Sequence, residues 1–421
     1  MTKTNKIVLG VLAAVLVVAV AFTALTGSEG FLRGITGSID TSAGEKLESL
    51  SPISHQTDYP LVQTEQKDLF YEMHPDGKFR FYRYADSAFT EVSGVKTKDV
   101  QLTCSSQKVK VKLYYLSTDA GTVGYGMFNS KQESTTKNLA YVFVRMTDCP
   151  KAYASKVKTD YILLTDMDEA DSYKPEKTYS DMYSLDMKSG KTSLVISQRD
   201  RLVQADGTMR EDWTIFTDSM LNNNEKYDIF ASCRNHDTTA EVQKYDFLTI
   251  ANSKAVKKSG ATTVSDSPSY VIREKDGAYY CFANTKDGFD LIKNGDKKKP
   301  LASFSGTFSE YAVSGSYILS KANSEVTDIT TGESISLKKA SFSELSGFIA
   351  NEDGTKFALF CGGSQQSLIL YNTVTDETKI ITDDIFDGGI CNFCFIDSDT
   401  VLFSAYSADD GSTADNRIIK L

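Results

Sequence analysis

The stretch "LILYNTVTDETKII" (368–381) places an apolar run before a polar turn and follows the turn with a second apolar run. The segment "DMYSLDMKSGKTSLVI" (181–196) has the same order of apolar and turn residues. Short runs rich in aromatic and β-branched residues, bounded by turn residues, are typical of strands buried on both faces. The pattern therefore predicts a β-hairpin that recurs along the chain.

The recurring hairpin predicts a repeat architecture. Asp-Gly or Asn-Gly pairs lie between many of the apolar runs, and these pairs accept the positive φ angles of tight turns. Spacing between hairpins scatters about the roughly 40–50-residue repeat of propeller blades. We predict an all-β fold, a seven-bladed β-propeller, with six or eight blades as alternatives. The aligned hairpins start near Asp181, Lys244, Phe289, Glu325 and Leu368.

One longer segment, "NEDGTKFALFCGGSQQSLILYNTVTDETKIIT" (351–382), resembles the repeat of TolB-type, WD40-like β-propellers. In that repeat an Asp-Gly-Lys-like turn precedes two strands, a second turn and a final strand. Ala350 and Asn351 stand where such repeats often have Ser-Pro, and the other repeats match loosely. The resemblance implies a fold and not an activity, because propellers carry unrelated functions. The matching positions are Asp353, Gly354, Lys356, Tyr371 and Asn372.

A propeller ring needs a strand from one chain end to complete the sheet formed by the other. The last residues of the sequence, "NRIIKL" (416–421), are predicted to form a strand. We expect "PLVQTEQ" (60–66) to pair with it and to close the ring.

Residues 7–25 form an uncharged apolar run, preceded by Lys3 and Lys6. At about 1.5 Å per residue, a helix over this run nearly crosses a hydrocarbon layer of about 30 Å. The preceding lysines place the N-terminus in the cytoplasm and the rest of the chain outside. A signal peptide cleaved near Ala19 and Ala21, followed by secretion, is the alternative.

The sequence thus divides into three predicted parts. A signal anchor or transmembrane helix occupies residues 1–26, a Gly/Ser-rich linker residues 27–59, and the propeller residues 60–421.

The charge distribution argues against nucleic-acid binding, and the cysteines are explained by the core. The formal net charge is −10, and the longest basic run is "DKKKP" (296–300), so we expect no nucleic-acid partner. Seven cysteines are an odd number, and most lie within apolar runs. We interpret them mainly as reduced core residues.

Several segments could carry chemistry, and each has a plainer interpretation. The loop around Asp166, Asp168, Glu169 and Asp171 could bind Ca²⁺, but it lacks the glycine and distal glutamate of an EF-hand. A solvated acidic loop is the favoured interpretation, as it is for "SADDGSTADN" (407–416).

The pair Cys391 and Cys394 forms a C-x-x-C motif within an apparent strand. We interpret these residues as two core thiols rather than a redox or zinc site. The segment "QADGTMREDW" (204–213), which contains the sole tryptophan, Trp213, departs from the Asp-box turn of sialidases.

Histidine chemistry has few possible sources, since the chain has only His55, His74 and His236, and His55 falls in the predicted linker. No metal-type histidine pair and no Gly-x-Ser-x-Gly nucleophile motif occurs. We therefore assign no catalytic, metal-binding or cofactor-binding residue and no cofactor.

The sequence predicts a membrane-anchored, extracytoplasmic propeller that binds or scaffolds a protein or small ligand at the cell surface. An extracytoplasmic hydrolase or lyase with its site at the mouth of the propeller channel is the alternative, because such sites need no local motif. A cell-envelope assembly factor is a weaker alternative. The sequence favours a non-enzymatic protein.

Overall fold

The computed structural model describes residues 50–64, 66–104, 107–129, 139–146, 160–168, 178–197, 213–219, 229–235, 243–251, 254–264, 273–275, 278–293, 296, 298–307, 310–337, 345–361, 366–381, 389–407 and 409–421. Within these residues the regular structure is β-strand, and no helix is long and apolar enough to cross a membrane. The predicted transmembrane segment, residues 1–26, lies outside the described residues.

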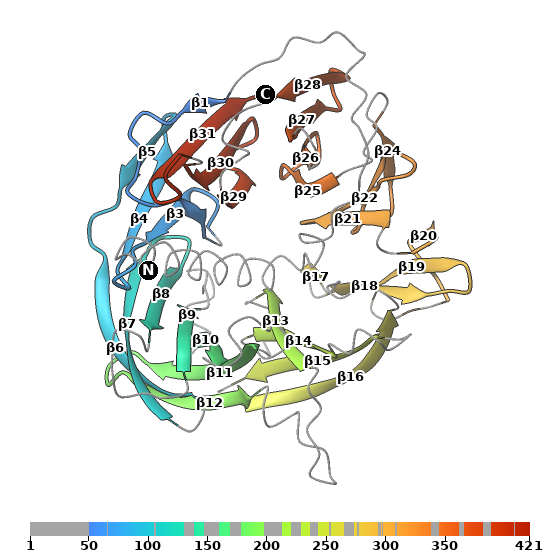
Figure 1. The fold of residues 1–421 in the computed structure, drawn as a ribbon. Coiled ribbons are helices and arrows are strands. Elements are labelled where there is room, and N and C mark those ends of the chain that lie inside the picture. Colours follow the sequence, from blue (N-terminus) through green and yellow to red (C-terminus); the bar gives the residue numbers. More distant parts are fainter. Residues whose placement is uncertain are drawn as a thin grey trace.

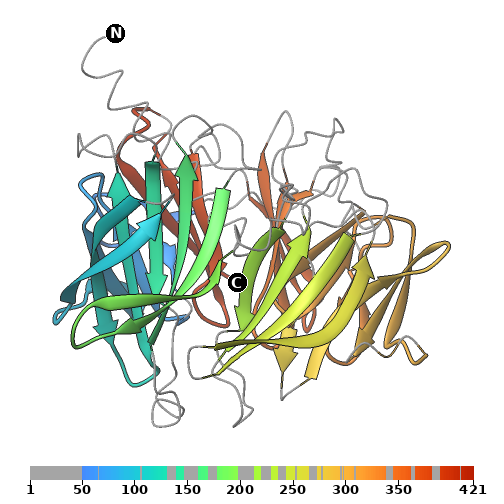
Figure 2. The same cartoon turned by 90° about the horizontal axis from the view of Figure 1, so that it is seen from below.

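The strands form six four-stranded sheets and one closed seven-stranded sheet, arranged around a central axis. Figure 1 shows the ring along this axis, and Figure 2 shows it from the side. The first sheet contains β2 (Val62–Gln63), β3 (Leu69–Met73), β4 (Phe79–Ala85) and β5 (Ala88–Glu91). Neighbouring strands within it are antiparallel.

The seven-stranded sheet follows the first sheet along the chain. Its strands are β6 (Lys96–Cys104), β7 (Gln107–Ser117), β8 (Thr122–Asn129), β9 (Leu139–Met146), β10 (Asp160–Asp168), β11 (Thr178–Asp186) and β12 (Lys191–Ser197). A single parallel pairing, Lys191 with Gln101, joins β12 to β6 and closes this sheet on itself.

Four antiparallel four-stranded sheets follow in chain order. They are β13 (Trp213–Ser219), β14 (Ile229–Asn235), β15 (Gln243–Ala251) and β16 (Lys254–Val264); β17 (Arg273–Lys275), β18 (Ala278–Asn284), β19 (Gly288–Lys293) and β20 (Ala302–Ser305); β21 (Tyr311–Ser314), β22 (Tyr317–Ser320), β23 (Glu325–Asp328) and β24 (Ser334–Ser336); and β25 (Leu345–Ala350), β26 (Lys356–Cys361), β27 (Ser367–Asn372) and β28 (Glu377–Ile381).

The last sheet joins the two ends of the described chain. It contains β29 (Gly389–Phe395), β30 (Thr400–Tyr406), β31 (Ala414–Lys420) and β1 (Ser51–Pro52). Ser51 pairs with Ile418, and Pro52 pairs with Arg417. The ring is therefore closed by an N-terminal strand, as expected, but the prediction that residues 60–66 supply this strand is wrong.

Residues 62–63 instead form β2, which pairs with β3 and begins the first sheet. The buried side chains of Leu61 and Val62 explain this position, because they pack between the first and last sheets and into the first sheet's interface with the seven-stranded sheet. The solvent-exposed residues Ser51 and Pro52 can occupy an outer edge, where proline loses no ladder hydrogen bond.

The core consists of apolar layers between successive sheets. In one such layer, Phe360 and Leu368 of one sheet pack against Phe403 and Ile419 of the last sheet. Strands β22, β26, β27 and β30 are buried at nearly every residue. This burial on both faces accounts for the continuous apolar runs in the sequence.

The hairpin predicted from 368–381 is present as β27–β28, and Asn372 of its turn accepts the backbone N–H of Val374 at 3.0 Å. The other aligned segments are likewise hairpins: β11–β12, β15–β16, β19–β20 and β23–β24. In each four-stranded case they are the third and fourth strands of the sheet. The repeated phrase therefore marks the same position in each of these sheets.

Candidate functional site

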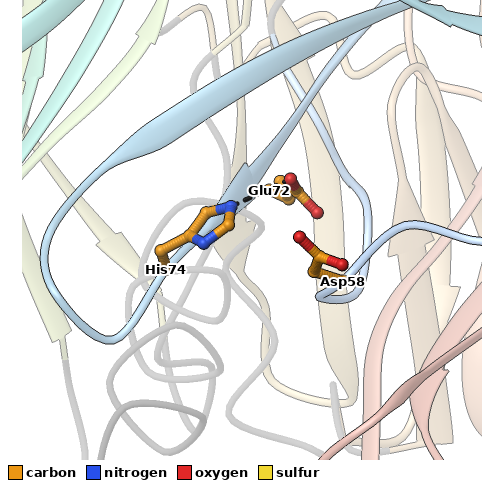
Figure 3. A group of neighbouring side chains, drawn as sticks. All are labelled: Asp58, Glu72 and His74. Carbon is orange, nitrogen blue, oxygen red and sulfur yellow. Dashed lines mark hydrogen bonds and ion pairs between the residues drawn. The ribbon is translucent and has the colours of Figure 1, made fainter.

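At the seam between the last sheet and the first sheet, several buried or partly buried polar residues lie close together. Residues 53–61 cross this seam from β1 to β2. Because β2 and β3 are antiparallel, with Val62 opposite Tyr71, the segment before β2 lies beside the end of β3. Asp58, just before β2, and His74, just after β3, are brought together in this way (Figure 3).

Glu72 is the centre of the cluster, and its side chain is fully buried. It lies in β3 directly opposite Arg80 of β4. Its Oε1 atom accepts from Tyr82 OH at 2.8 Å, and its Oε2 atom accepts from the backbone N–H of Tyr59 at 3.1 Å. These bonds make it possible to bury a carboxylate, which otherwise costs several kcal/mol.

Arg80 bridges the two carboxylates of the cluster. Its Nη1 atom lies 2.9 Å from Asp58 Oδ2 and 3.2 Å from Glu72 Oε1. The Arg80 side chain is 44% exposed, whereas that of Glu72 is 0% exposed. The guanidinium therefore reaches into the cluster from solvent.

His74 completes the cluster through a short contact with the buried carboxylate. Its Nε2 atom lies 2.9 Å from Glu72 Oε1, and its ring meets the Tyr59 ring edge-on at 4.7 Å between centroids. The turn that follows fixes the backbone of His74, since its N–H donates to Lys78 O at 2.9 Å and its carbonyl accepts from Gly77 N at 2.9 Å. Gly77 has φ of 82°, the conformation that the Asp-Gly pair predicted.

The position of Asp58 depends on a second, buried polar group in the last sheet. Asn416 Nδ2 donates to Thr57 Oγ1 at 2.9 Å and to Gln56 Oε1 at 3.2 Å. The backbone N–H of Leu61 donates to Ser404 Oγ at 2.7 Å. Residues 56–61 are thus held to β30 and β31 on both sides of Asp58.

The surroundings of the cluster raise the pKa values of two nearby tyrosines. Burial is the main cause of the raised pKa of Tyr82, and the hydrogen bond to Glu72 raises it further. Burial, followed by the charges of Asp58 and Asp76, raises the pKa of Tyr59. Both hydroxyls therefore stay protonated at neutral pH, and Tyr82 can act as a hydrogen-bond donor to Glu72.

The arrangement has two chemical capacities. Asp58, Glu72 and His74 can each offer one ligand atom, and these atoms all lie within 4.8 Å of one another, as a cation site requires. A carboxylate that holds one imidazole nitrogen also leaves the other nitrogen to exchange protons, as general acid–base chemistry requires.

The sequence pointed to His74 as one of two usable histidines but assigned it no role. His55, in the seam segment, is solvent-exposed, and His236 lies outside the described residues. Asp58 and Glu72 were not predicted. A glutamate inside the apolar strand run "LFYEM" (69–73) is the signal that could have drawn attention to the position.

The structure places the remaining sequence candidates apart from this cluster or outside the described residues. Asp166 and Asp168 belong to β10 and Trp213 to β13, but their side chains lie outside the described residues, as do Glu169 and Asp171. Asp410 accepts the backbone N–H groups of Thr413 and Ser412 at 2.9 and 2.8 Å, and these bonds lower its pKa to about 2. Asp410 thus caps its own turn.

The C-x-x-C pair lies in β29 at the seam, and neither thiol forms a disulfide. Cys394 is buried among apolar residues of the first and last sheets. Burial raises the pKa of the Cys391 and Cys394 thiols to about 12. This environment agrees with two core thiols and opposes formation of the thiolate that redox chemistry needs.

A closed ring of mainly antiparallel sheets, in which the first and last described strands pair in one sheet, defines the protein as a β-propeller. The repeat predicted from residues 351–382 contains β26, β27 and β28, the second, third and fourth strands of one four-stranded sheet, in the order strand, strand, turn and strand that the resemblance to TolB-type propellers implies.

No family model matches the chain, and no curated protein matches it in sequence. Its fold is similar to that of TolB from Acinetobacter baumannii, at 12% identity over 72% of this chain and 78% of that chain, with a TM-score of 0.31. It is also similar to Saccharomyces cerevisiae Sqt1, at 8% identity over 89% and 100% of the two chains, with a TM-score of 0.40. An oligogalacturonate lyase in complex with manganese is 10% identical over 92% and 97%, with a TM-score of 0.34.

Proposed function

We propose that this protein is a seven-bladed propeller, the closed seven-stranded sheet counting as one blade, that binds a protein or small ligand outside the cytoplasm. An N-terminal helix over residues 7–25 holds it at the membrane. Its role is to bind or scaffold at the cell surface.

The observation that carries this proposal is where the chain enters the ring. In the last sheet β1 lies at one edge, and β29 lies at the opposite edge, where it contacts β2 and β25 of the neighbouring sheets. Figure 1 shows β1 at the periphery of the ring and β29 close to its centre. The described chain therefore enters the ring at its rim, which is compatible with an anchor before β1 and a partner at either end of the ring.

The test combines topology with capture. Protease added to intact cells should digest the propeller, and alkaline washing should leave the full chain in the membrane fraction. Cross-linking before solubilisation should then recover one partner in near-equal amount. A variant lacking residues 1–26 is the matched control for membrane attachment. Protection of the propeller in intact cells would overturn the proposed location, and a monomer that captures nothing would overturn the scaffold.

An extracytoplasmic hydrolase or lyase is a second candidate, and the pairing of Glu72 with His74 is the observation that favours it. A buried carboxylate 2.9 Å from Nε2 orients the imidazole. When Nε2 carries the proton, Nδ1 is free to accept one from a substrate. The ring of His74 is 13% exposed, which gives a substrate limited access.

Turnover by purified wild-type and variant chains on hydrolase and lyase substrate panels separates the two candidates. An enzyme that depends on this pair should lose activity in His74→Ala and keep it in His55→Ala, because His55 is exposed and does not belong to the pair. Absence of turnover in the wild type, or equal turnover in both variants, would remove this candidate.

A further inference from the structure

We propose that Asp58, Glu72 and His74 bind one divalent transition-metal ion at the ring seam, and that Arg80 leaves the two carboxylates when the ion enters. This inference goes beyond the proposed function and does not rest on it. It concerns the side chains drawn in Figure 3.

The first argument is geometric. One ligand atom from each of the three residues lies within 4.8 Å of the others. Two adjacent ligands of an ion with bonds of about 2.1 Å are separated by about 3.0 Å in an octahedral site and by about 3.4 Å in a tetrahedral site. His74 Nε2 and Glu72 Oε1 are 2.9 Å apart, so this pair already has the separation of two adjacent ligands.

The second argument concerns how Glu72 is held. The hydroxyl of Tyr82 donates to Oε1, and the backbone N–H of Tyr59 donates to Oε2. Neither contact involves Arg80, so both can persist when the guanidinium departs. Outer hydrogen bonds of this kind fix the orientation of metal-ligating carboxylates.

The third argument concerns charge. Two carboxylates face one guanidinium, so with a neutral imidazole the group of four side chains carries one uncompensated negative charge. The Arg80 Nη1 atom, at 2.9 Å from Asp58 and 3.2 Å from Glu72, lies where a cation between the carboxylates would lie. A divalent ion in that place neutralises both carboxylates, and the 44% exposed Arg80 side chain can move into solvent.

The donor set indicates the class of ion. Imidazole nitrogen favours zinc, cobalt, nickel, copper and iron over magnesium and calcium, which prefer oxygen ligands. A bound ion would also join Asp58, in the segment that crosses the seam, to β3 in the first sheet. Binding should therefore raise the thermal stability of the closed ring.

The test is titration of the full chain in detergent micelles with Co²⁺, followed by visible absorption and calorimetry. Cobalt is the probe because its absorption distinguishes nitrogen and oxygen ligands from the thiolates of the seven cysteines. One ion should bind per chain without a thiolate band, and the melting temperature should rise.

Variants assign the binding to these residues. His74→Ala and Asp58→Asn should each weaken Co²⁺ binding at least about tenfold. Arg80→Ala should strengthen it, because the competing cation is gone. His55→Ala is the matched control and should bind as the wild type does. Asp58 is exposed, so Asp58→Asn keeps the test decisive even if His74→Ala fails to fold.

Three results would overturn the proposal. They are the absence of one saturable Co²⁺ site, a spectrum with thiolate bands alone, and affinity that is unchanged in Asp58→Asn. Binding weakened by Arg80→Ala would refute the competition between the guanidinium and the ion.

Discussion

Replacing Asn416 by alanine should weaken the seam far more than its single side chain suggests. Asn416 is fully buried in β31, and its amide joins the last sheet to the segment that leads into β2. The alanine variant keeps the backbone pairing of β31 with β30 and β1, so the change isolates the side-chain bonds.

The size of the effect follows from those bonds. The Oδ1 atom accepts from Leu61 N at 3.2 Å and from the Ser404 hydroxyl, and the Nδ2 atom donates to Gln56 Oε1 at 3.2 Å and Thr57 Oγ1 at 2.9 Å. Each bond contributes about 0.5–1.5 kcal/mol net. Leu61 N keeps its hydrogen bond to Ser404 Oγ at 2.7 Å, and Gln56 Oε1 keeps its hydrogen bond from Asn416 N at 2.9 Å. These two remaining bonds compensate for part of the loss. We expect a loss of about 2–4 kcal/mol.

Urea unfolding followed by circular dichroism measures this loss, and Asn323→Ala is the matched control. Asn323 lies in the exposed turn after β22, where a substitution should change stability by less than about 0.5 kcal/mol. Hydrogen exchange of peptides covering 53–63 should accelerate in Asn416→Ala alone. A loss below about 1 kcal/mol, or unchanged exchange in this segment, would refute the assignment of the seam to this amide.

Two further predictions concern backbone strain and thiol chemistry. Gly354→Ala should lower the melting temperature more than Gly411→Ala does. Both glycines have positive φ, but a Cβ at position 354 would overlap the Tyr317 ring, whereas a Cβ at position 411 would meet open space. Equal melting temperatures of the two variants would contradict this prediction. The pKa of the Cys391 and Cys394 thiols is about 12 in the folded protein, above the unfolded value of about 8.5. The contribution of the two thiols to folding stability is therefore complete below about pH 8.5 and is lost as the pH rises toward about 12. Mass-spectrometric alkylation at pH 8 should leave both thiols unmodified until urea is added, and modification without urea would contradict the burial.

The repeated hairpin was predictable because its signal is local. The apolar run 368–371 and the turn residue Asn372 lie in one continuous segment, and the turn is stabilised by bonds within itself. The same is true of Gly77, Gly354 and Gly411, whose positive φ angles follow from Asp-Gly pairs. A pattern of this kind needs no knowledge of distant parts of the chain.

Ring closure was only partly predictable, because the closing strand has almost no local signal. Ser51 and Pro52 are exposed and lack the apolar alternation of a strand. Their pairing with β31 depends on flanking residues, since Leu50 and Ile53 are both buried against the ring. The stronger apolar run at 60–62 suggested the wrong strand because burial in an inner strand and burial in a closing strand produce the same sequence pattern.

The cluster at Glu72 could not be assembled from the sequence for a different reason. Asp58 and Glu72 become neighbours only because β2 returns antiparallel beside β3. The segment around Asp58 is held by Asn416, which lies 358 positions further along the chain. Asn416 forms hydrogen bonds to Gln56 and Thr57, which are 360 and 359 positions away from Asn416. Sequence spacing carries no information about such a contact until the ring has closed.

The seam is the natural place for chemistry that the repeats do not share. A repeated hairpin serves the packing of each sheet against its neighbours, and inner strands such as β27 are buried at nearly every residue. Among the described strands, the connection from β1 to β2 joins the last sheet of the ring to the first one, whereas the aligned hairpins each lie within one sheet. A buried carboxylate, a histidine and an exposed aspartate can be placed there without disturbing a repeated interface, and any cation they hold acts directly on the closure of the ring.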